Sequence, residues 1–316
     1  MAVVQQSASA PRSRSFTSIF KQKKAAPWVE DTPIWLTILK FLALIFIALA
    51  MLLPFINVIA TSFSSAEDVM AGGFHLFPSH PTLESYKVLL SGGTVARSLW
   101  VTVCLTVIGT FFQMIFTTAL AFGLAKKGVP GSKFFLALVL GAFLFGPGMI
   151  PSYLLIKNLG LIDSYAALIL PGLIQSWNLI ILRSFFQGLP QDLLDAARID
   201  GANDFGVLWN VALPLSKAVL AVVALFYGVA IWNTFFNAIL YLNDASKWPI
   251  QVVLRQYVLE QTNITSAGSF PPDRKPPPSE GIQMAMVIMA TVPILIVYPF
   301  LQKYFTKGVI TGAIKG

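Results

Sequence analysis

The chain has 316 residues, of which 56% are hydrophobic and only 11% are charged, and its mean hydropathy is +0.72. A soluble domain usually carries about 25% charged residues, so the composition excludes an ordinary soluble protein and indicates an integral membrane protein. The net charge of +8 could indicate a nucleic-acid partner, but the cations gather at the ends of apolar runs rather than on one polar face. We therefore interpret them as membrane-topology signals and expect no nucleic acid.

The N-terminal residues 1–33 are basic and rich in Ser and Ala. No short apolar stretch with a small-residue cleavage site follows them, so we predict a cytoplasmic tail rather than a cleaved signal peptide. The single cysteine, Cys104, lies inside an apolar run, where a thiol usually acts as a small hydrophobe. His75 and His80 share one polar segment without a second ligand cluster, so we predict no metal site and no cofactor bound by this chain.

A helix that spans a bilayer needs about 20 apolar residues, and the hydropathy pattern predicts six such helices. The predicted spans are residues 35–59, 99–125, 134–156, 165–182, 218–240 and 284–301. Long polar segments lie at 62–96 and 241–281, and a short tail lies at 307–316. The predicted fold is therefore an all-α membrane domain over residues 34–306, with both termini on one side.

The distribution of Lys and Arg predicts which side that is. The segments on the side of the N-terminus carry fourteen of these cations, whereas the other side carries seven, spread over longer loops. Since positive residues are retained in the cytoplasm, both termini and the segment between spans four and five are predicted to be cytoplasmic.

The predicted spans two to six contain no Asp, Glu, Lys or Arg. Ion-driven carriers usually need buried ionisable groups, so this absence argues against a self-powered carrier. The sequence also lacks a phosphate-binding loop, a His-Glu-x-x-His motif and a Gly-x-Ser-x-Gly motif. We therefore predict a transport subunit rather than an enzyme, with the energy supplied by a partner.

Helix breakers and polar side chains interrupt the apolar spans. The breakers in the third span are Gly146, Pro147, Gly148 and Pro151. Candidate residues along a path for a polar substrate are Trp177, Asn178, Tyr227, Trp232 and Asn233. Aromatic faces and amides suit sugar rings, but the same residues commonly make helix–helix contacts or anchor a span at the membrane interface.

The polar segment 189–214 surfaces between the fourth and fifth predicted spans. Pro190 suits the first turn of a helix, and Leu189, Leu193 and Ala197 follow at helical spacing. We therefore predict a short amphipathic helix, with Leu189, Leu193 and Ala197 on its apolar stripe.

Gly201 is predicted to end that helix, and Asn203 is predicted to cap a second one. The apolar repeat of this second helix consists of Phe205, Leu208, Trp209 and Ala212. Such a helix–turn–helix could seat in a cleft of a soluble protein, or it could be an ordinary amphipathic connector at the membrane surface.

The motif Asp195-Ala196-Ala197, followed by Gly201 and then Val211-Ala212-Leu213-Pro214, resembles the signature loop of ATP-binding-cassette (ABC) importer permeases, Glu-Ala-Ala-x3-Gly-x9-Ile-x-Leu-Pro. Asp195 stands where the family has Glu, which keeps the charge but shortens the reach of the side chain, and Val211 is a conservative replacement for Ile. The extension Arg198 to Ala202 is similar to the carbohydrate-uptake branch, which includes the maltose permeases. The C-terminal run from Tyr298 to Gly316 resembles a subgroup that imports oligosaccharides, including an alginate importer.

The resemblance implies the type I importer permease fold, with a cytoplasmic coupling helix between helices four and five. Asp195 and Asp200 would make charge-assisted contacts with an ATPase subunit. Ala196 and Ala197 would let the helix sit close to that subunit. Gly201 would form the bend, and Leu213 and Pro214 close the motif.

The partners that the resemblance implies are a homologous second permease in a heterodimer, two ATPase subunits that bind ATP and Mg, and an extracytoplasmic solute-binding protein. The segments 62–96 and 241–281 would receive the binding protein, and the tail 307–316 could contact the ATPases. The cargo would be a sugar, expected to be an oligosaccharide, carried across the cytoplasmic (inner) membrane. The alternatives are an ABC permease for a non-sugar solute, a channel or secondary carrier, and a membrane enzyme without a visible catalytic constellation.

Overall fold

The computed structural model describes residues 33–74, 76–259 and 279–313. These residues form helices and no strand, apart from one isolated bridge between Ser64 and Pro81. The chain divides into two compact units, residues 1–52 and 53–316. Most of the predicted N-terminal tail, the proline-rich part of the second polar segment and the last three residues lie outside the described ranges.

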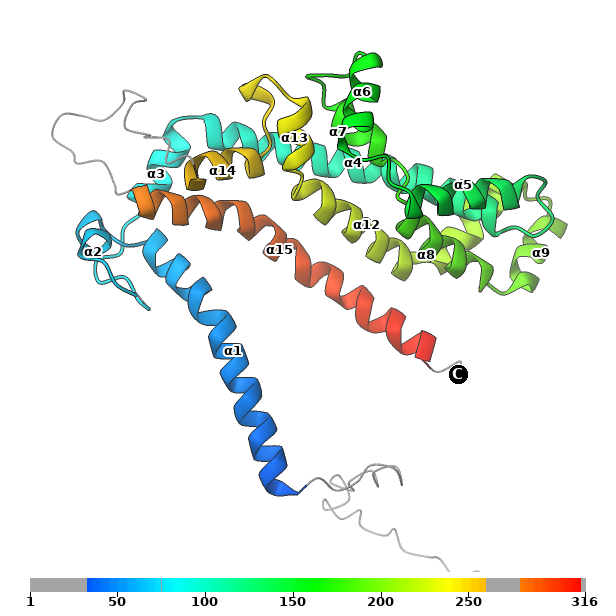
Figure 1. Cartoon of the computed structure of the whole chain (residues 1–316). Helices are drawn as coiled ribbons and strands as arrows, with labels where there is room; N and C mark the ends of the chain where they lie inside the picture. The colour runs from blue at the N-terminus through cyan, green and yellow to red at the C-terminus, as the bar shows by residue number, and fades with distance from the viewer. Residues whose placement is uncertain (1–32, 75, 260–278, 314–316) are drawn as a thin grey trace, which may run out of the picture. The chain divides into compact units, whose positions relative to one another are not determined.

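Three long helices are joined by many short ones (Figure 1). The long helices are α1 (Ile34–Ser62), α4 (Thr94–Ala125) and α15 (Ser279–Ala313). The shorter α-helices are α2 (Ala66–Ala71), α3 (Glu84–Ser91), α5 (Ser132–Leu144), α6 (Met149–Asn158), α7 (Ala166–Ile169), α8 (Ser176–Gln187), α9 (Gln191–Ile199), α10 (Asp204–Val207), α11 (Leu213–Leu215), α12 (Lys217–Trp232), α13 (Phe236–Tyr241) and α14 (Ile250–Leu259). Two 3-10 turns (Leu170–Gly172, Ala245–Lys247) and one π-helical turn (Leu208–Ala212) complete the described elements.

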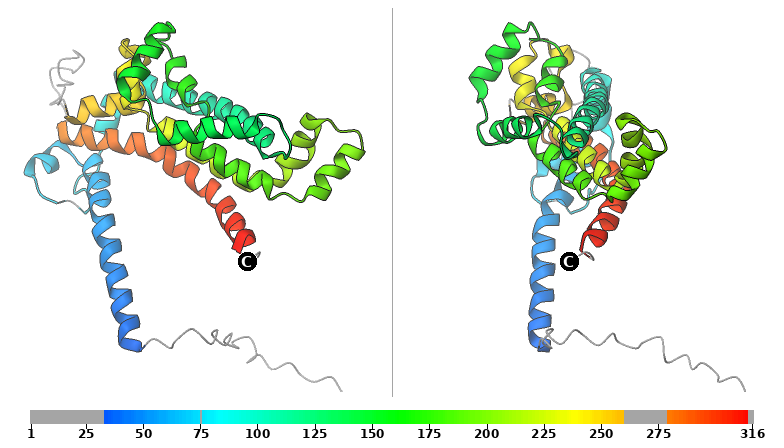
Figure 2. Two further views of the ribbon diagram at one scale, coloured as in Figure 1. Left: turned by 45° about the vertical axis from the view of Figure 1, so that its right-hand side comes forward. Right: turned by 90° about the vertical axis from the view of Figure 1, so that its right-hand side faces the viewer.

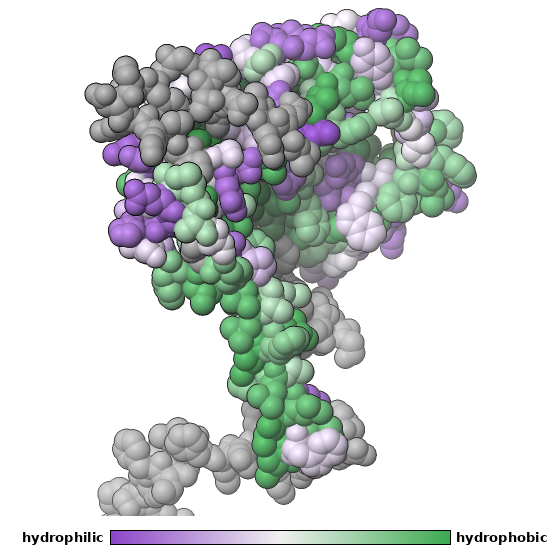
Figure 3. All heavy atoms as spheres, turned by 60° about the vertical axis from the view of Figure 1, so that its left-hand side comes forward, coloured by the Kyte–Doolittle hydropathy of each residue, from purple (hydrophilic) through white to green (hydrophobic). Residues whose placement is uncertain are grey.

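Helix α1 is long enough to cross a membrane, because its 29 residues rise about 44 Å and a hydrocarbon core measures about 30 Å. Its sequence contains one charged residue, Lys40, and one proline, Pro54. Figure 3 shows a mostly hydrophobic surface along this helix, in the lower part of the picture. This surface identifies α1 as a helix made to contact lipid or other apolar partners.

Three described helices are long and apolar enough to span a membrane by themselves: Ile34–Ser62, Thr94–Ala125 and Ser279–Pro299. Three further pairs of helices pass the same test together but are bent at a short break, so the number of candidate spans is as high as six. The all-α membrane fold is therefore confirmed. The exact number of spans stays a prediction, because several of the candidates are broken.

The third predicted span is the most strongly bent. It consists of α5 and α6, whose axes differ by 120° across the break at residues 145–148. Gly148 has φ +78°, which favours glycine, and Pro147 cannot continue a helix. The break in the third predicted span therefore lies at Gly146, Pro147 and Gly148. Pro151 lies in the first turn of α6, where proline is tolerated.

The fourth and fifth predicted spans are also interrupted. The fourth consists of α7 and α8, bent by 46° after the 3-10 turn that contains Pro171. The fifth, predicted over 218–240, covers α12, which ends at Trp232, and α13, which begins at Phe236. At this break Asn233 Nδ2 donates to the Val229 carbonyl at 2.9 Å, and Thr234 Oγ1 donates to the Ala230 carbonyl at 3.2 Å. Such side-chain bonds compete with the next helical turn and end the helix.

Helices α4, α8 and α12 form the packed centre of the second unit and lie alongside one another (Figures 1 and 2). The buried apolar residues of this centre are Ala121, Leu124, Leu179, Leu182, Phe186, Leu189, Leu194, Val207, Ala212, Val223 and Tyr227. They come from these three helices and from the segment between α8 and α12. The core therefore fixes that segment directly against the spans.

Helix α4 turns a polar side toward this core. Its buried polar residues are Ser98, Thr102, Gln113, Thr117 and Thr118. In lipid, apolar side chains face outward without cost, whereas polar ones gain from facing other helices, where they find hydrogen-bond partners. Thr102 Oγ1, for example, accepts a hydrogen bond from the Ile250 backbone N–H at 2.8 Å.

The two long segments that were expected to be polar loops contain helices. Helices α2 and α3 lie in the first segment, and α14 lies in the second. Helix α14 packs against α15 through Ile250, Val253 and Met286, all of them fully or nearly fully buried. In the described parts of both segments, α3 and α14 therefore contribute to the folded core of the second unit.

Candidate functional site

Residues 189–214, called the coupling segment after their predicted role, form two short helices that are joined at a bend. Helix α9 ends at Ile199, and Gly201 follows with φ +88°, a conformation that side chains with a Cβ rarely adopt. Asn203 then caps α10, since its Oδ1 accepts a hydrogen bond from the Gly206 N–H at 2.8 Å. The two short helices are therefore joined by a bend whose geometry is fixed by Gly201 and Asn203.

The buried face of α9 differs from the predicted stripe. Leu194 is buried against the core at 5% exposure, whereas Leu193 is 47% exposed. Helix α9 begins only at Gln191, after a Pro190 with extended ψ, so Leu189 is not in helical register with the residues that follow. The prediction that Leu189, Leu193 and Ala197 share one apolar face was therefore wrong for Leu193.

The opposite face of the coupling segment exposes large apolar side chains. Ile199 is 86% exposed, Phe205 70% and Trp209 63%. The rings of Phe205 and Trp209 stack with their centroids 6.2 Å apart. Exposed aromatic side chains next to carboxylates suit contact with another protein, because burying them would remove apolar area from water.

The predicted motif residues lie on both sides of this segment. Asp195, Ala196 and Asp200 are exposed, whereas Ala197 and Leu213 are half-buried. Pro214 is exposed inside the single turn of α11. The motif therefore exposes the carboxylates of Asp195 and Asp200 at α9. Its later residues, Leu213 and Pro214, lie in the short helix that leads into α12.

An ion-pair network ties the coupling segment to the end of α4. Lys126 Nζ lies 2.8 Å from Asp204 Oδ2, and Arg198 Nη1 lies 2.7 Å from Asp195 Oδ1. The hydrogen bond from Lys126 lowers the pKa of the Asp204 carboxyl below its usual value. No local pattern in the sequence predicts the pair of Lys126 and Asp204, because the two residues are 78 positions apart.

Tyr227, Asn178 and Trp232 are buried within the helices. The Tyr227 hydroxyl lies 2.6 Å from Thr117 Oγ1 and accepts a hydrogen bond from the Gln175 N–H at 3.0 Å. Asn178 is 1% exposed, and Trp232 Nε1 donates to the Ala290 carbonyl of α15 at 3.0 Å. Tyr227 and Trp232 therefore connect helices to one another, whereas the Asn178 amide donates to Gln175 Oε1 at 3.4 Å, three residues earlier.

The other two candidates for the substrate path are accessible. Trp177 is 57% exposed and stacks on Phe143 with centroids 6.3 Å apart, and Asn233 is exposed at the end of α12. Gly146, Pro147 and Gly148 are exposed as well, between α5 and α6. The five predicted residues thus fall into a buried group and an exposed group, and their role in a path stays a prediction.

A second polar cluster, which the sequence analysis missed, surrounds Asp163. This residue has φ +61°, and its Oδ1 accepts hydrogen bonds from the Asn243 and Asp244 N–H groups at 3.1 Å each. Lys247 Nζ donates to its Oδ2 at 2.7 Å, and this bond is the largest cause that lowers the pKa of the Asp163 carboxyl. The cluster joins the loop before α7 to the loop after α13.

Taken together, the long and broken apolar helices are those of a multi-span membrane protein. In the residues that the structure describes, no group of three His, Cys, Asp or Glu side chains could hold a metal ion. The model of a family described as binding-protein-dependent transport system inner membrane component matches residues 89–311. The chain belongs to this family and is a multi-pass inner-membrane permease subunit of an ABC importer.

Two curated relatives are both from Bacillus subtilis (strain 168). The polygalacturonan/rhamnogalacturonan transport system permease protein YtcP is 46% identical over 273 residues, which cover 86% of this chain and 96% of that protein. Protein LplC is also 46% identical, over 84% of this chain and 90% of its own length. A third relative, the arabinooligosaccharides transport system permease protein AraQ from Halalkalibacterium halodurans, is 30% identical over 89% of this chain and 96% of its own length.

A solved structure supports the same fold. One chain of a bacterial ABC transporter involved in the import of the acidic polysaccharide alginate matches with a TM-score of 0.81 and 29% sequence identity. The match covers 89% of this chain and 100% of that chain. The predicted resemblance to ABC importer permeases is therefore confirmed.

Proposed function

We propose that this permease carries an oligosaccharide, released from a polysaccharide, into the cell. The observation that carries this proposal is the 46% identity over most of the chain to YtcP, whose name specifies polygalacturonan and rhamnogalacturonan transport. The relative named for arabinooligosaccharides and the structural match named for alginate import support the same class of cargo. The substrate path would use Trp177 and Asn233, the two candidates that are accessible.

The coupling segment would dock into an ATPase subunit that binds ATP and Mg. Asp195 and Asp200 would offer carboxylates, and the stacked Phe205 and Trp209 would bury apolar area in the contact. Gly201 would hold the bend between the two helices. This chain would transmit the movement, and ATP hydrolysis would take place on the partners.

The complete transporter would contain a second, homologous permease, two ATPase subunits and an extracytoplasmic binding protein. Both termini and the coupling segment would lie in the cytoplasm, as the distribution of Lys and Arg indicates. The helical segments that contain α3 and α14 would then lie on the outer side, where the binding protein docks.

Two measurements test this proposal in the assembled transporter reconstituted in liposomes. The first compares uptake of galacturonan fragments, neutral oligosaccharides and amino acids, each offered with the binding protein that selects it. We expect uptake of oligosaccharides only. Uptake of amino acids alone would refute the proposal that the cargo is an oligosaccharide.

The second measurement uses Asp195→Lys, with Lys217→Glu as a control that reverses an exposed charge outside the segment. We expect Asp195→Lys to abolish uptake while the subunit stays inserted and ATP hydrolysis continues uncoupled. Full uptake by Asp195→Lys would refute the proposed role of the coupling segment.

A further inference from the structure

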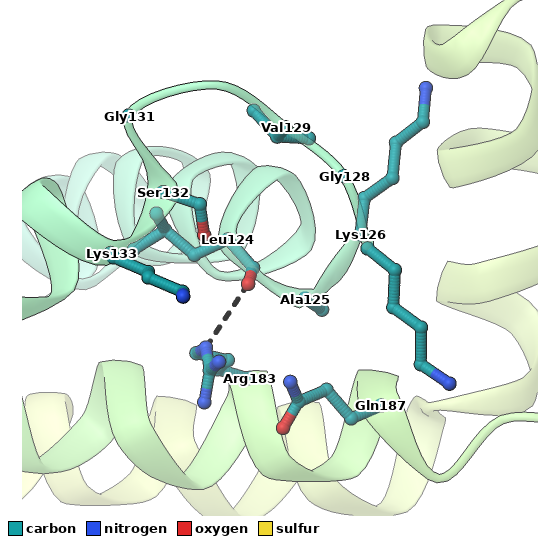
Figure 4. Close-up of a pocket in the computed structure, with 11 residues that line it drawn as sticks. Leu124, Ala125, Lys126, Gly128, Val129, Gly131, Ser132, Lys133, Arg183 and Gln187 are labelled. Atoms are coloured by element: carbon teal, nitrogen blue, oxygen red, sulfur yellow. Dashed lines mark hydrogen bonds between the residues drawn. The ribbon is translucent and has the colours of Figure 1, made fainter.

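A basic pocket lies where α4 ends and α5 begins (Figure 4). It has a volume of about 460 Å³, within the range of about 300–1,000 Å³ that is typical of ligand sites. Its charged lining residues are Lys126, Lys127, Lys133 and Arg183, and no carboxylate lines it. The pocket therefore concentrates positive charge around a space large enough for a polar head group.

The loop between α4 and α5 shapes this pocket. Gly128 and Gly131 have φ of +81° and +77°, which fold residues 126–133 back over the start of α5. Figure 4 shows Lys133 reaching from α5 and Arg183 reaching from α8 toward the same gap. Lys133 and Arg183 therefore approach one gap from two separate helices, whereas Lys126 points away from it toward Asp204 (Figure 4).

Three of these cations have no counter-charge. Lys126 is paired with Asp204, but among the residues that the structure describes no carboxylate pairs with Lys127, Lys133 or Arg183. Arg183 is held in place, because its Nε donates to the Leu124 carbonyl at 3.1 Å, which leaves the two terminal nitrogens of the guanidinium for another acceptor. Like charges gathered in one pocket repel one another, so an anion bound there stabilises the fold.

The surroundings of the pocket indicate what carries that anion. Helix α5 starts at the pocket and has no buried residue, and Phe134, Phe135 and Leu138 are each more than half exposed. An anion with an attached hydrocarbon chain would neutralise the cations of the pocket, and its chain would cover the exposed apolar side chains of α5. Basic pockets next to apolar helices are typical sites for anionic phospholipid head groups.

We propose that this pocket binds the phosphate head group of an anionic phospholipid such as phosphatidylglycerol, with the acyl chains lying along α5. Arg183 would make paired hydrogen bonds to two phosphate oxygens, and Lys127 and Lys133 would add point charges. The inference does not depend on which solute the permease carries.

The test uses the full chain in nanodiscs of phosphatidylcholine, with trace spin-labelled phosphatidylglycerol or spin-labelled phosphatidylcholine as the probe. We expect the wild type to select phosphatidylglycerol. The double variant Lys127→Gln, Lys133→Gln keeps the Arg183–Leu124 bond and removes two cations, each worth about a 5-fold change in affinity. The control Lys157→Gln, Lys217→Gln removes the same charge at exposed positions outside the pocket.

Loss of selectivity in the pocket variant alone supports the proposal. Equal selectivity in all three proteins, or equal losses in both variants, overturns it. Inorganic phosphate and glycerol phosphate serve as competitors without acyl chains, and displacement of the labelled lipid by either at millimolar concentration would identify a free anion as the occupant instead. Loss of the bound lipid when the ATPase subunits assemble would identify an acidic protein segment, and it would overturn the proposal as well.

Discussion

The bend at Gly201 gives the sharpest test of the coupling segment. With φ at +88°, this residue lies in a region that costs an L-residue with a Cβ about 1–2 kcal/mol. A Cβ built at Gly201 meets no atom within 4 Å, so a substitution there introduces no steric clash. The whole cost of Gly201→Ala is therefore backbone strain, and that strain acts on the relative orientation of α9 and α10.

The expected magnitudes follow from the side chains. Gly201→Asn should cost least, because Asn tolerates positive φ better than other residues with a Cβ. Gly201→Ala should lower the population of the bent form about 5- to 30-fold, and the β-branched Gly201→Val should lower it further. Gly201→Pro requires a rotation of φ by about 150°, because proline fixes φ near −65°, so the bend cannot form.

The assay measures transported solute per ATP hydrolysed in liposomes that contain the complete transporter. Coupling should decrease in the order Asn, Ala, Val, Pro. Gly123→Ala is the matched control, because Gly123 lies in helix α4 with open space around it, and Ala is favoured in a helix. Equal coupling in Gly201→Ala and Gly123→Ala would refute the claim that coupling depends on the positive φ of Gly201. Equal losses of coupling in Gly201→Asn and Gly201→Val would refute it as well.

Three further outcomes are expected. Lys126→Asp or Asp204→Lys should weaken the attachment of the coupling segment by no more than about 1 kcal/mol, as is usual for an exposed ion pair. The double variant should restore uptake, and additive losses of uptake would contradict the pairing. Tyr227→Phe should lower the free energy of unfolding of the detergent-purified chain by about 1–3 kcal/mol, because it leaves the Gln175 N–H without its acceptor, whereas Tyr153→Phe should change it little. Hydrogen bonds from Lys247 and from the Asp244 N–H lower the pKa of the Asp163 carboxyl, so its stabilisation is present above the unfolded value of about 3.9 and is lost as pH falls through the lower folded value. An acid titration of the melting temperature should therefore show a smaller decrease below about pH 4 for Asp163→Asn, and an unchanged profile would contradict this assignment.

Local signals in the sequence predicted where the coupling segment bends and where its second short helix begins. The bend at Gly201 and the cap at Asn203 depend on residues within three positions, so the chain carries that information locally. The apolar runs likewise predicted an all-α membrane fold. Helix α14 was missed because its segment is polar overall, although Ile250, Val253 and Tyr257 repeat at helical spacing and could have revealed it.

Other features depend on contacts that no local pattern encodes. Pro147 predicts a break in the third span but not the 120° angle, because α5 packs against α4 and α8 whereas α6 packs against α13. The sequence also could not decide between a substrate-path role and a helix contact for Tyr227. Its partner Thr117 is 110 residues away, and only the fold brings the two hydroxyls together.

These distant contacts of α4 have a consequence for biosynthesis. Thr117 meets its partner 110 residues later, and Thr102 receives the Ile250 N–H 148 residues later. At a translation rate of about 5–20 residues per second, Ile250 is synthesised roughly 7–30 s after Thr102. Until Ile250 is made, the part of the polar side around Thr102 lacks this partner, so a message truncated before codon 250 should yield an inserted but incompletely assembled chain that proteases of the membrane can degrade.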